Sequence, residues 1–110
     1  MEDRFTQITD TNALEQLLTR SHDAPVVLFK HSTTCPISAA AYKQMSKVGN
    51  EVSLVVVQRA RDVSSEIASR TGIQHESPQA IVLRNGEAVW AASHFDITAG
   101  AVEEAVREHE

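Results

Sequence analysis

Cysteine is nearly absent from this sequence of 110 residues, in which Cys35 is the only one. A single cysteine cannot form a disulfide within its own chain, so any disulfide that it makes must be intermolecular. Apolar runs are short as well, and none approaches the ~20 residues that a membrane-spanning helix requires. These absences exclude an internal disulfide framework and argue against insertion into a membrane.

Clustered positive charge is also missing. The ten lysines and arginines are scattered, and the formal net charge is -5, which argues against a nucleic-acid surface. The start of the chain, residues 1–6, lacks the charged and then apolar segments of a secretory signal, so we expect a cytoplasmic protein. The length and a composition with 42% apolar residues predict one domain over residues 1–110.

The first half of the chain predicts strands and helices in alternation. Leucines at spacings of three and four predict a helix that is capped within residues 10–12 and runs to about Arg20. Residues 26–29 form an apolar run without alternation, which is typical of a central strand covered on both faces. A short strand is expected at residues 5–8.

Cys35 follows this central strand. Polar residues 31–34 lead into Cys35 and Pro36, and proline suits the first turn of a helix. The apolar residues that follow, at helical spacing from Ile37 to Val48, predict a helix that ends at Gly49-Asn50. Cys35 is therefore expected at a junction between a strand and a helix.

The second half continues the alternation and closes with a hairpin. It predicts a strand at 52–57, a helix capped by Asp62 and ended by Gly72, strands at 80–83 and 88–91 joined by a type I′ turn at Asn85-Gly86, and a last helix from Thr98 to about Arg107. The resulting order is βαβαβαββα, an α/β fold with a central mixed sheet flanked by helices. Thioredoxin-like folds have this order.

The position of Cys35 favours a reactive thiol over a small buried apolar residue. The thiolate is the nucleophilic form of cysteine, and the unpaired amides and positive dipole end of a helix N-terminus stabilise an anion. We expect the amides of Ile37 and Ser38 to be the donors, because Pro36 has no N–H, with help from the hydroxyls of Thr34 and Ser38.

Ser38 stands where a Cys-x-x-Cys pair would have its second thiol. A serine can donate a hydrogen bond to sulfur but cannot form a disulfide. A mixed disulfide on Cys35 must therefore be released by an external thiol. A second feature, Ser77-Pro78, precedes the strand at 80–83, where proline suits a turn and where the cis form is open to it.

The motif Thr34-Cys35-Pro36-Ile37-Ser38, together with the preceding strand and polar loop, resembles the YtxJ-like, monothiol bacilliredoxin branch of the thioredoxin superfamily. The resemblance spans nearly the whole chain, and Ser77-Pro78 matches the cis-proline loop of that superfamily. It implies a thiol–disulfide oxidoreductase that uses Cys35 to take bacillithiol from S-bacillithiolated client proteins. Bacillithiol, a low-molecular-weight thiol, would then be the co-substrate that regenerates Cys35, with no tightly bound cofactor.

The same resemblance implies further partners and site residues. The bacillithiol disulfide that is produced would be recycled by an NADPH-dependent reductase. Ser77 and Pro78 would line the substrate groove opposite Cys35. Iron–sulfur-carrying monothiol glutaredoxins have Cys-Gly-Phe-Ser, which differs from the residues at 35–38.

Two other functions stay open at this point. One is a non-catalytic stress or adaptor protein in which Cys35 is only a site of S-thiolation, and the other is an iron–sulfur carrier made by two chains. A metal site has weak support, since we expect His31 to be an ordinary surface or loop residue. The cations Lys30, Lys43, Arg59 and Arg61 are of a kind that attracts carboxylates, but such side chains are mostly solvated, and none is assigned.

Overall fold

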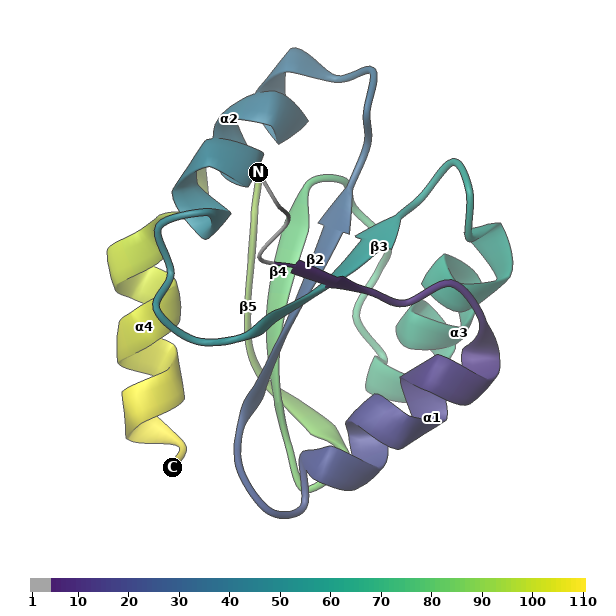
Figure 1. Ribbon diagram of the computed structural model, residues 1–110, viewed down its shortest axis with the longest axis vertical. Coiled ribbons are helices and arrows are strands. Elements are labelled where there is room, and N and C mark those ends of the chain that lie inside the picture. Colours follow the sequence, from purple (N-terminus) through teal and green to yellow (C-terminus); the bar gives the residue numbers. More distant parts are fainter. Residues whose placement is uncertain (1–4) are drawn as a thin grey trace.

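A mixed sheet of five strands lies at the centre of the computed structural model, which describes residues 5–110 (Figure 1). The strands are β1 (Phe5–Gln7), β2 (Val26–His31), β3 (Val52–Val56), β4 (Gln79–Arg84) and β5 (Glu87–Ser93). The helices are α1 (Thr11–Arg20), α2 (Pro36–Met45), α3 (Arg61–Thr71) and α4 (Ala99–Glu108), with a 3₁₀ turn, η1 (His94–Asp96), after β5. The predicted βαβαβαββα order is confirmed.

The strands follow the order β1-β3-β2-β4-β5, so β2 lies in the middle of the sheet. β2 is parallel to β3 and antiparallel to β4. Every residue of β2 except Val26 is buried, as expected for an apolar strand that is covered on both faces. The carboxyl end of β2 leads through a short loop into α2.

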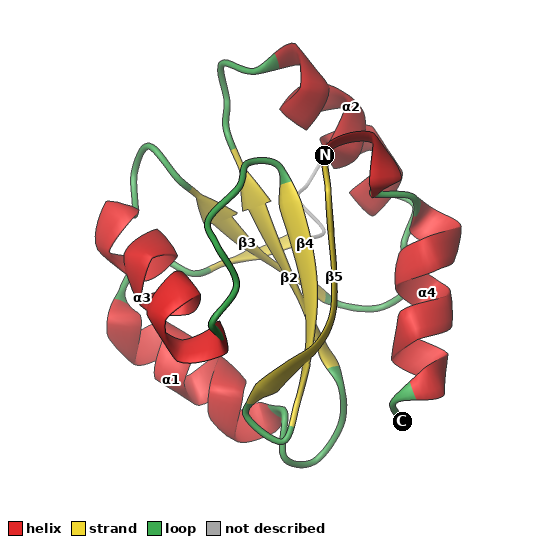
Figure 2. Ribbon diagram, turned by 180° about the vertical axis from the view of Figure 1, so that it is seen from behind, coloured by secondary structure: helices red, strands yellow, loops and turns green. Residues whose placement is uncertain are grey.

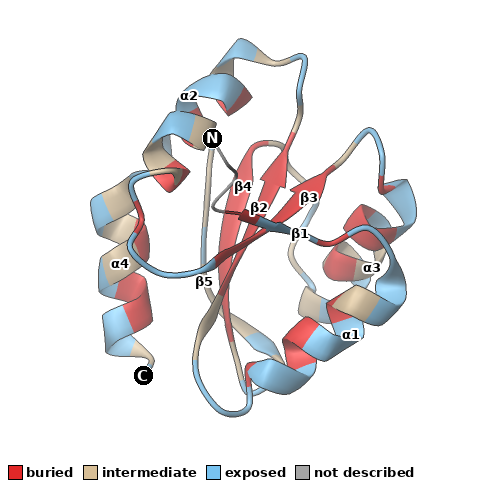
Figure 3. Cartoon of the chain, in the orientation of Figure 1, coloured by how far each residue is buried: buried red, intermediate tan, exposed pale blue. Residues whose placement is uncertain are grey.

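Helices cover both faces of the sheet. α2 and α4 lie on one face, and α1 and α3 lie on the other (Figure 2). Phe29 packs in the cluster that includes Met45 and Val102, whereas its neighbour Leu28 packs in the cluster that includes Ile67. The buried residues follow the central strands and the inner sides of the helices (Figure 3). Because side chains alternate along a strand, residue 30 faces α1 and α3, and residue 31 faces α2 and α4.

Two of the predicted helix starts are confirmed by side-chain caps. The carboxylate of Asp10 accepts a hydrogen bond of 2.8 Å from the amide of Ala13, and the hydroxyl of Thr98 accepts one of 3.2 Å from the amide of Ala101. Each bond satisfies an amide that has no partner within its helix. The turn at Asn85-Gly86 is also confirmed, with φ angles of 58° and 78°.

Two predicted helix boundaries are wrong, the end of α2 and the start of α3. α2 ends at Met45 rather than at Gly49, because Ser46 caps it and its hydroxyl donates a hydrogen bond of 2.8 Å to the carbonyl of Tyr42. α3 begins before Asp62, with Ala60 as its N-cap residue, and Asp62 lies in the first turn. No helix within residues 5–110 is long and apolar enough to cross a membrane. Residues 1–4, on which the expectation about a secretory signal partly rests, lie outside the described residues.

Candidate functional site

Cys35 is the N-cap residue of α2 and has the extended backbone angles of a cap, with φ -106° and ψ 123°. Pro36 occupies the start of the helix, as predicted. The thiol is free and partly exposed. Its side chain accepts no capping hydrogen bond from the first turn, so the expected amide donors are not engaged in this structure. Cys35 is therefore a partly exposed residue at the positive end of the α2 dipole.

Ser38 is fully buried and forms two hydrogen bonds on the inner side of α2. Its Oγ accepts a hydrogen bond of 2.9 Å from the amide of Ser32 and lies 2.8 Å from Nδ1 of His31. Burial lowers the pKa of His31, and its hydrogen bond with Ser38 raises the pKa by a smaller amount. The lowered pKa favours the neutral ring at pH 7. A neutral ring carries its proton at Nδ1 or at Nε2, so Nδ1 either donates to the Ser38 hydroxyl or accepts from it. The hydroxyl that was expected near the sulfur is thus bonded to His31.

His31 is buried at 9% exposure, so the expectation of a surface or loop histidine is wrong. Its ring centroid lies 4.9 Å from that of Tyr42 and 5.6 Å from that of Phe29. The reason is that β2 extends two residues beyond the apolar run. His31 pairs with Val56 of β3 and faces α2. It anchors the inner end of the loop that carries Cys35.

Gln58 holds the outer side of the same loop. Its Oε1 accepts a hydrogen bond of 3.3 Å from the amide of Thr33, and its Nε2 donates to Ser32 Oγ at 2.9 Å and to Thr34 Oγ1 at 3.2 Å. The hydroxyl of Thr34 is therefore an acceptor for Gln58. Sequence reasoning missed Gln58, and its position just after the strand at 52–57 is the only signal that could have suggested it.

The peptide bond between Ser77 and Pro78 is cis. Pro78 is buried, and its carbonyl accepts a hydrogen bond of 3.2 Å from the amide of His94. The next residue, Gln79, pairs with Lys30 near the carboxyl end of β2. The structure therefore places Ser77 and Pro78 at the same end of the sheet as Cys35, on a different loop.

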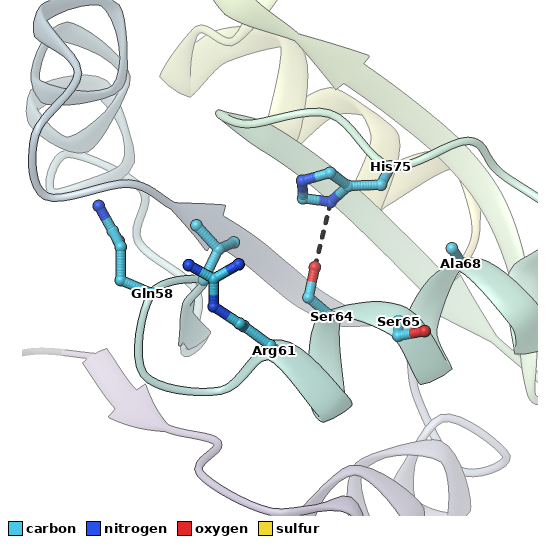
Figure 4. A pocket seen from close by; sticks show the side chains of 7 residues that line it. Gln58, Arg61, Ser64, Ser65, Ala68 and His75 are labelled. Atoms are coloured by element: carbon cyan, nitrogen blue, oxygen red, sulfur yellow. Dashed lines mark hydrogen bonds between the residues drawn. The ribbon is translucent and has the colours of Figure 1, made fainter.

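A cavity of ≈ 370 Å³ lies on the α3 side of this end of the sheet. Gln58, Arg61, Ser64 and His75 line it together with Val57, Ser65 and Ala68 (Figure 4). Ser64 Oγ and His75 Nδ1 are 3.1 Å apart and join α3 to the loop before β4. Gln58 belongs both to this cavity and to the hydrogen bonds that hold the Cys35 loop, so the two features are adjacent.

Metal-binding chemistry finds no support among the described residues. Within residues 5–110 no group of three or more histidine, cysteine, aspartate or glutamate side chains is placed to hold a metal ion. Three of the five histidines have other partners: Nδ1 of His94 lies 3.5 Å from the carboxylate of Glu76, and His31 and His75 form hydrogen bonds with serines.

Together the mixed sheet, the partly exposed cysteine at the start of α2 and the cis-proline loop define a one-thiol redox protein of the thioredoxin-like class. A family model for the monothiol bacilliredoxin BrxC matches residues 6–102. The chain belongs to the monothiol bacilliredoxin family.

Solved structures agree with this assignment. A structure described as an oxidoreductase with a thioredoxin fold is 38% identical, with a TM-score of 0.84 and coverage of 91% of each chain. The thioredoxin of Fasciola hepatica is 13% identical, with a TM-score of 0.75 over 96% of this chain and 100% of that one. Thioredoxin f2 of Chlamydomonas reinhardtii is 14% identical, with a TM-score of 0.73 and 96% of each chain covered. The two thioredoxins show the fold alone.

Proposed function

We propose that the chain removes bacillithiol from S-bacillithiolated proteins by two successive thiol–disulfide exchanges. In the first, the Cys35 thiolate attacks the bacillithiol sulfur of the client's mixed disulfide. A bond between Cys35 and bacillithiol forms, the bond to the client breaks, and the client leaves as a thiolate that takes up a proton. In the second, the thiolate of another bacillithiol attacks the adduct, which releases bacillithiol disulfide and restores the Cys35 thiolate.

The observation that carries this proposal is the state of Ser38. The second thiol of a Cys-x-x-Cys pair would stand at this position, but Cys35 is the one cysteine of the sequence, and residue 38 is a buried serine whose oxygen is bonded to Ser32 and His31. Cys35 itself is accessible and unpaired. The adduct on Cys35 can therefore leave only by attack of a thiol from solution.

The remaining parts of the proposal follow from the family. Two electrons pass from bacillithiol to the client, and bacillithiol disulfide is the oxidised product. An NADPH-dependent reductase of that disulfide would complete the cycle in the cytoplasm. Ser77 and Pro78, at the same end of the sheet as Cys35, would align the client or thiol against the sulfur.

A turnover assay tests this function against a purely S-thiolated adaptor. A bacillithiolated client is incubated with excess bacillithiol and a catalytic amount of protein, and the released client thiol is measured. We expect each protein molecule to release many clients, and Cys35→Ala to release none. With Ser38→Cys the rate should depend less on the bacillithiol concentration, because that variant can form an internal disulfide. Modification of Cys35 without release of client would refute catalysis and favour the adaptor.

A further inference from the structure

Lys30 is a buried cation that the site described so far does not use. Its exposure is 0%, and its Nζ has no hydrogen-bond partner among the described residues. Burial lowers the pKa of Lys30 to about 8. An ammonium group that is buried without a partner is costly, and an apolar residue would fit a central strand better. The lysine therefore points to a ligand of opposite charge.

The sheet places Lys30 between the two walls of the cavity. Lys30 is in register with Val55 on β3 and with Gln79 on β4, so its side chain shares the α3 face with Val55. Val57, the next residue on that face after Val55, lines one wall, and His75, in the loop before β4, lines the other. Because β2 runs between β3 and β4, Lys30 lies beneath the cavity.

The electrostatics agree with this placement. The positive charge of Lys30 contributes to a lowered pKa of His75, after the larger effect of burial and against an opposing effect of Glu76. The ammonium is thus close enough to act on a ring that lines the cavity. Gln79, the partner of Lys30 on β4, also has a buried Oε1 without a hydrogen-bond partner.

The lining of the cavity suits an anion. The cavity lies beside the first turns of α3, the positive end of that helix, with Arg61 exposed at its rim (Figure 4). None of its seven lining residues is an aspartate or glutamate. Glu76 acts on His75 from outside the lining and is paired with His94. A carboxylate at this position would meet Arg61 at the rim, with the buried charge of Lys30 behind the lining and no acid among the lining residues.

We propose that this cavity binds a carboxylate of the low-molecular-weight thiol whose sulfur exchanges with Cys35. The proposal rests on the proposed function, and it adds where the carboxylate end of that thiol binds while its sulfur lies at Cys35. Gln58 supplies the link, because it lines the cavity and its amide is bonded to Ser32 and Thr34 next to Cys35. A thiol with its sulfur at Cys35 therefore has the cavity beside it.

The test compares two disulfides of different charge. Reduced protein is mixed with bacillithiol disulfide, which carries carboxylates, or with bis(2-hydroxyethyl) disulfide, which is uncharged. In either case Cys35 forms a mixed disulfide and one thiolate is released, and the rate of adduct formation is followed by intact mass. The variants are Lys30→Met and Arg61→Gln, with Arg59→Gln as a control that removes the same charge as Arg61→Gln outside the lining.

We expect Lys30→Met and Arg61→Gln each to slow the reaction with bacillithiol disulfide by about tenfold, a factor that corresponds to ~1.4 kcal/mol of lost attraction between the cation and the carboxylate. Their rates with the uncharged disulfide should equal that of the wild type, and Arg59→Gln should change either rate by less than about twofold. The decisive quantity is the rate with bacillithiol disulfide divided by the rate with the uncharged disulfide. If this ratio were equal in the wild type and in Arg61→Gln, the proposal would be overturned even if Lys30→Met failed to fold. An equal loss in Arg59→Gln would also overturn it. A wild type that does not react with bacillithiol disulfide would refute the proposed function itself.

Discussion

Replacement of Lys30 by methionine should stabilise the protein at neutral pH. The pKa of Lys30 falls from an ordinary value of 10.5 to about 8 because the ammonium is buried. At 1.36 kcal/mol per pKa unit, this difference corresponds to about 3 kcal/mol of destabilisation by the charged form. Methionine has a similar length and no charge, and it would lie among the apolar residues that surround position 30 on the α3 face.

The sign of the pH dependence follows from proton linkage. Below pH 8 the lysine is protonated in both the folded and the unfolded chain, and the full penalty for burying the charge is present. Between pH 8 and 10.5 the folded chain has lost this proton while the unfolded chain still holds it, so the stability rises with pH. Lys30→Met removes this contribution.

Urea denaturation of both proteins at pH 7 and pH 10 provides the measurement. The variant should exceed the wild type in free energy of unfolding by about 2 to 3 kcal/mol at pH 7, and this difference should shrink by pH 10. The comparison cancels the other titrating groups, which the two proteins share. A variant that is less stable at pH 7, or a difference that does not change with pH, would refute the account of Lys30 as a buried and unpaired cation.

Two further predictions concern the loop that carries Cys35. Ser38→Ala should lower the free energy of unfolding by about 1 to 3 kcal/mol, because His31 Nδ1 and the amide of Ser32 lose a buried partner, and unchanged stability in urea would contradict the hydrogen bonds described. Gln58→Ala should leave global stability within ~0.5 kcal/mol but speed hydrogen exchange at the amide of Thr33, which NMR can follow; an unchanged exchange rate would mean that Gln58 does not hold the loop.

The order of elements could be predicted because each apolar pattern agrees with its place in the fold. Residues 26–29 lie in the centre of the sheet, and the turn at Asn85-Gly86 requires positive φ angles that glycine and asparagine tolerate. Helix ends were harder to predict because several capping residues compete. At the end of α2, the hydroxyl of Ser46 satisfies the last turn before Gly49 is reached.

The environment of the thiol could be predicted only in part. The position of Cys35 follows from local signals, namely a strand, a polar loop and a proline. The burial of Lys30 and His31 depends on how far β2 continues, and pairing with β3 and β4 extends it through residues whose polarity suggests a loop. The bonds of Gln58 join segments that lie far apart in the sequence, and no local pattern reports them.

A single-turnover exchange tests the central claim most directly. Reduced protein is mixed with an equal amount of bacillithiolated client in the absence of free thiol, and the intact masses of both proteins are recorded over time. The client should lose the mass of bacillithiol while the protein gains it at Cys35, and a glutathionylated client should react more slowly. A client that keeps its bacillithiol while Cys35 stays unmodified would contradict the account.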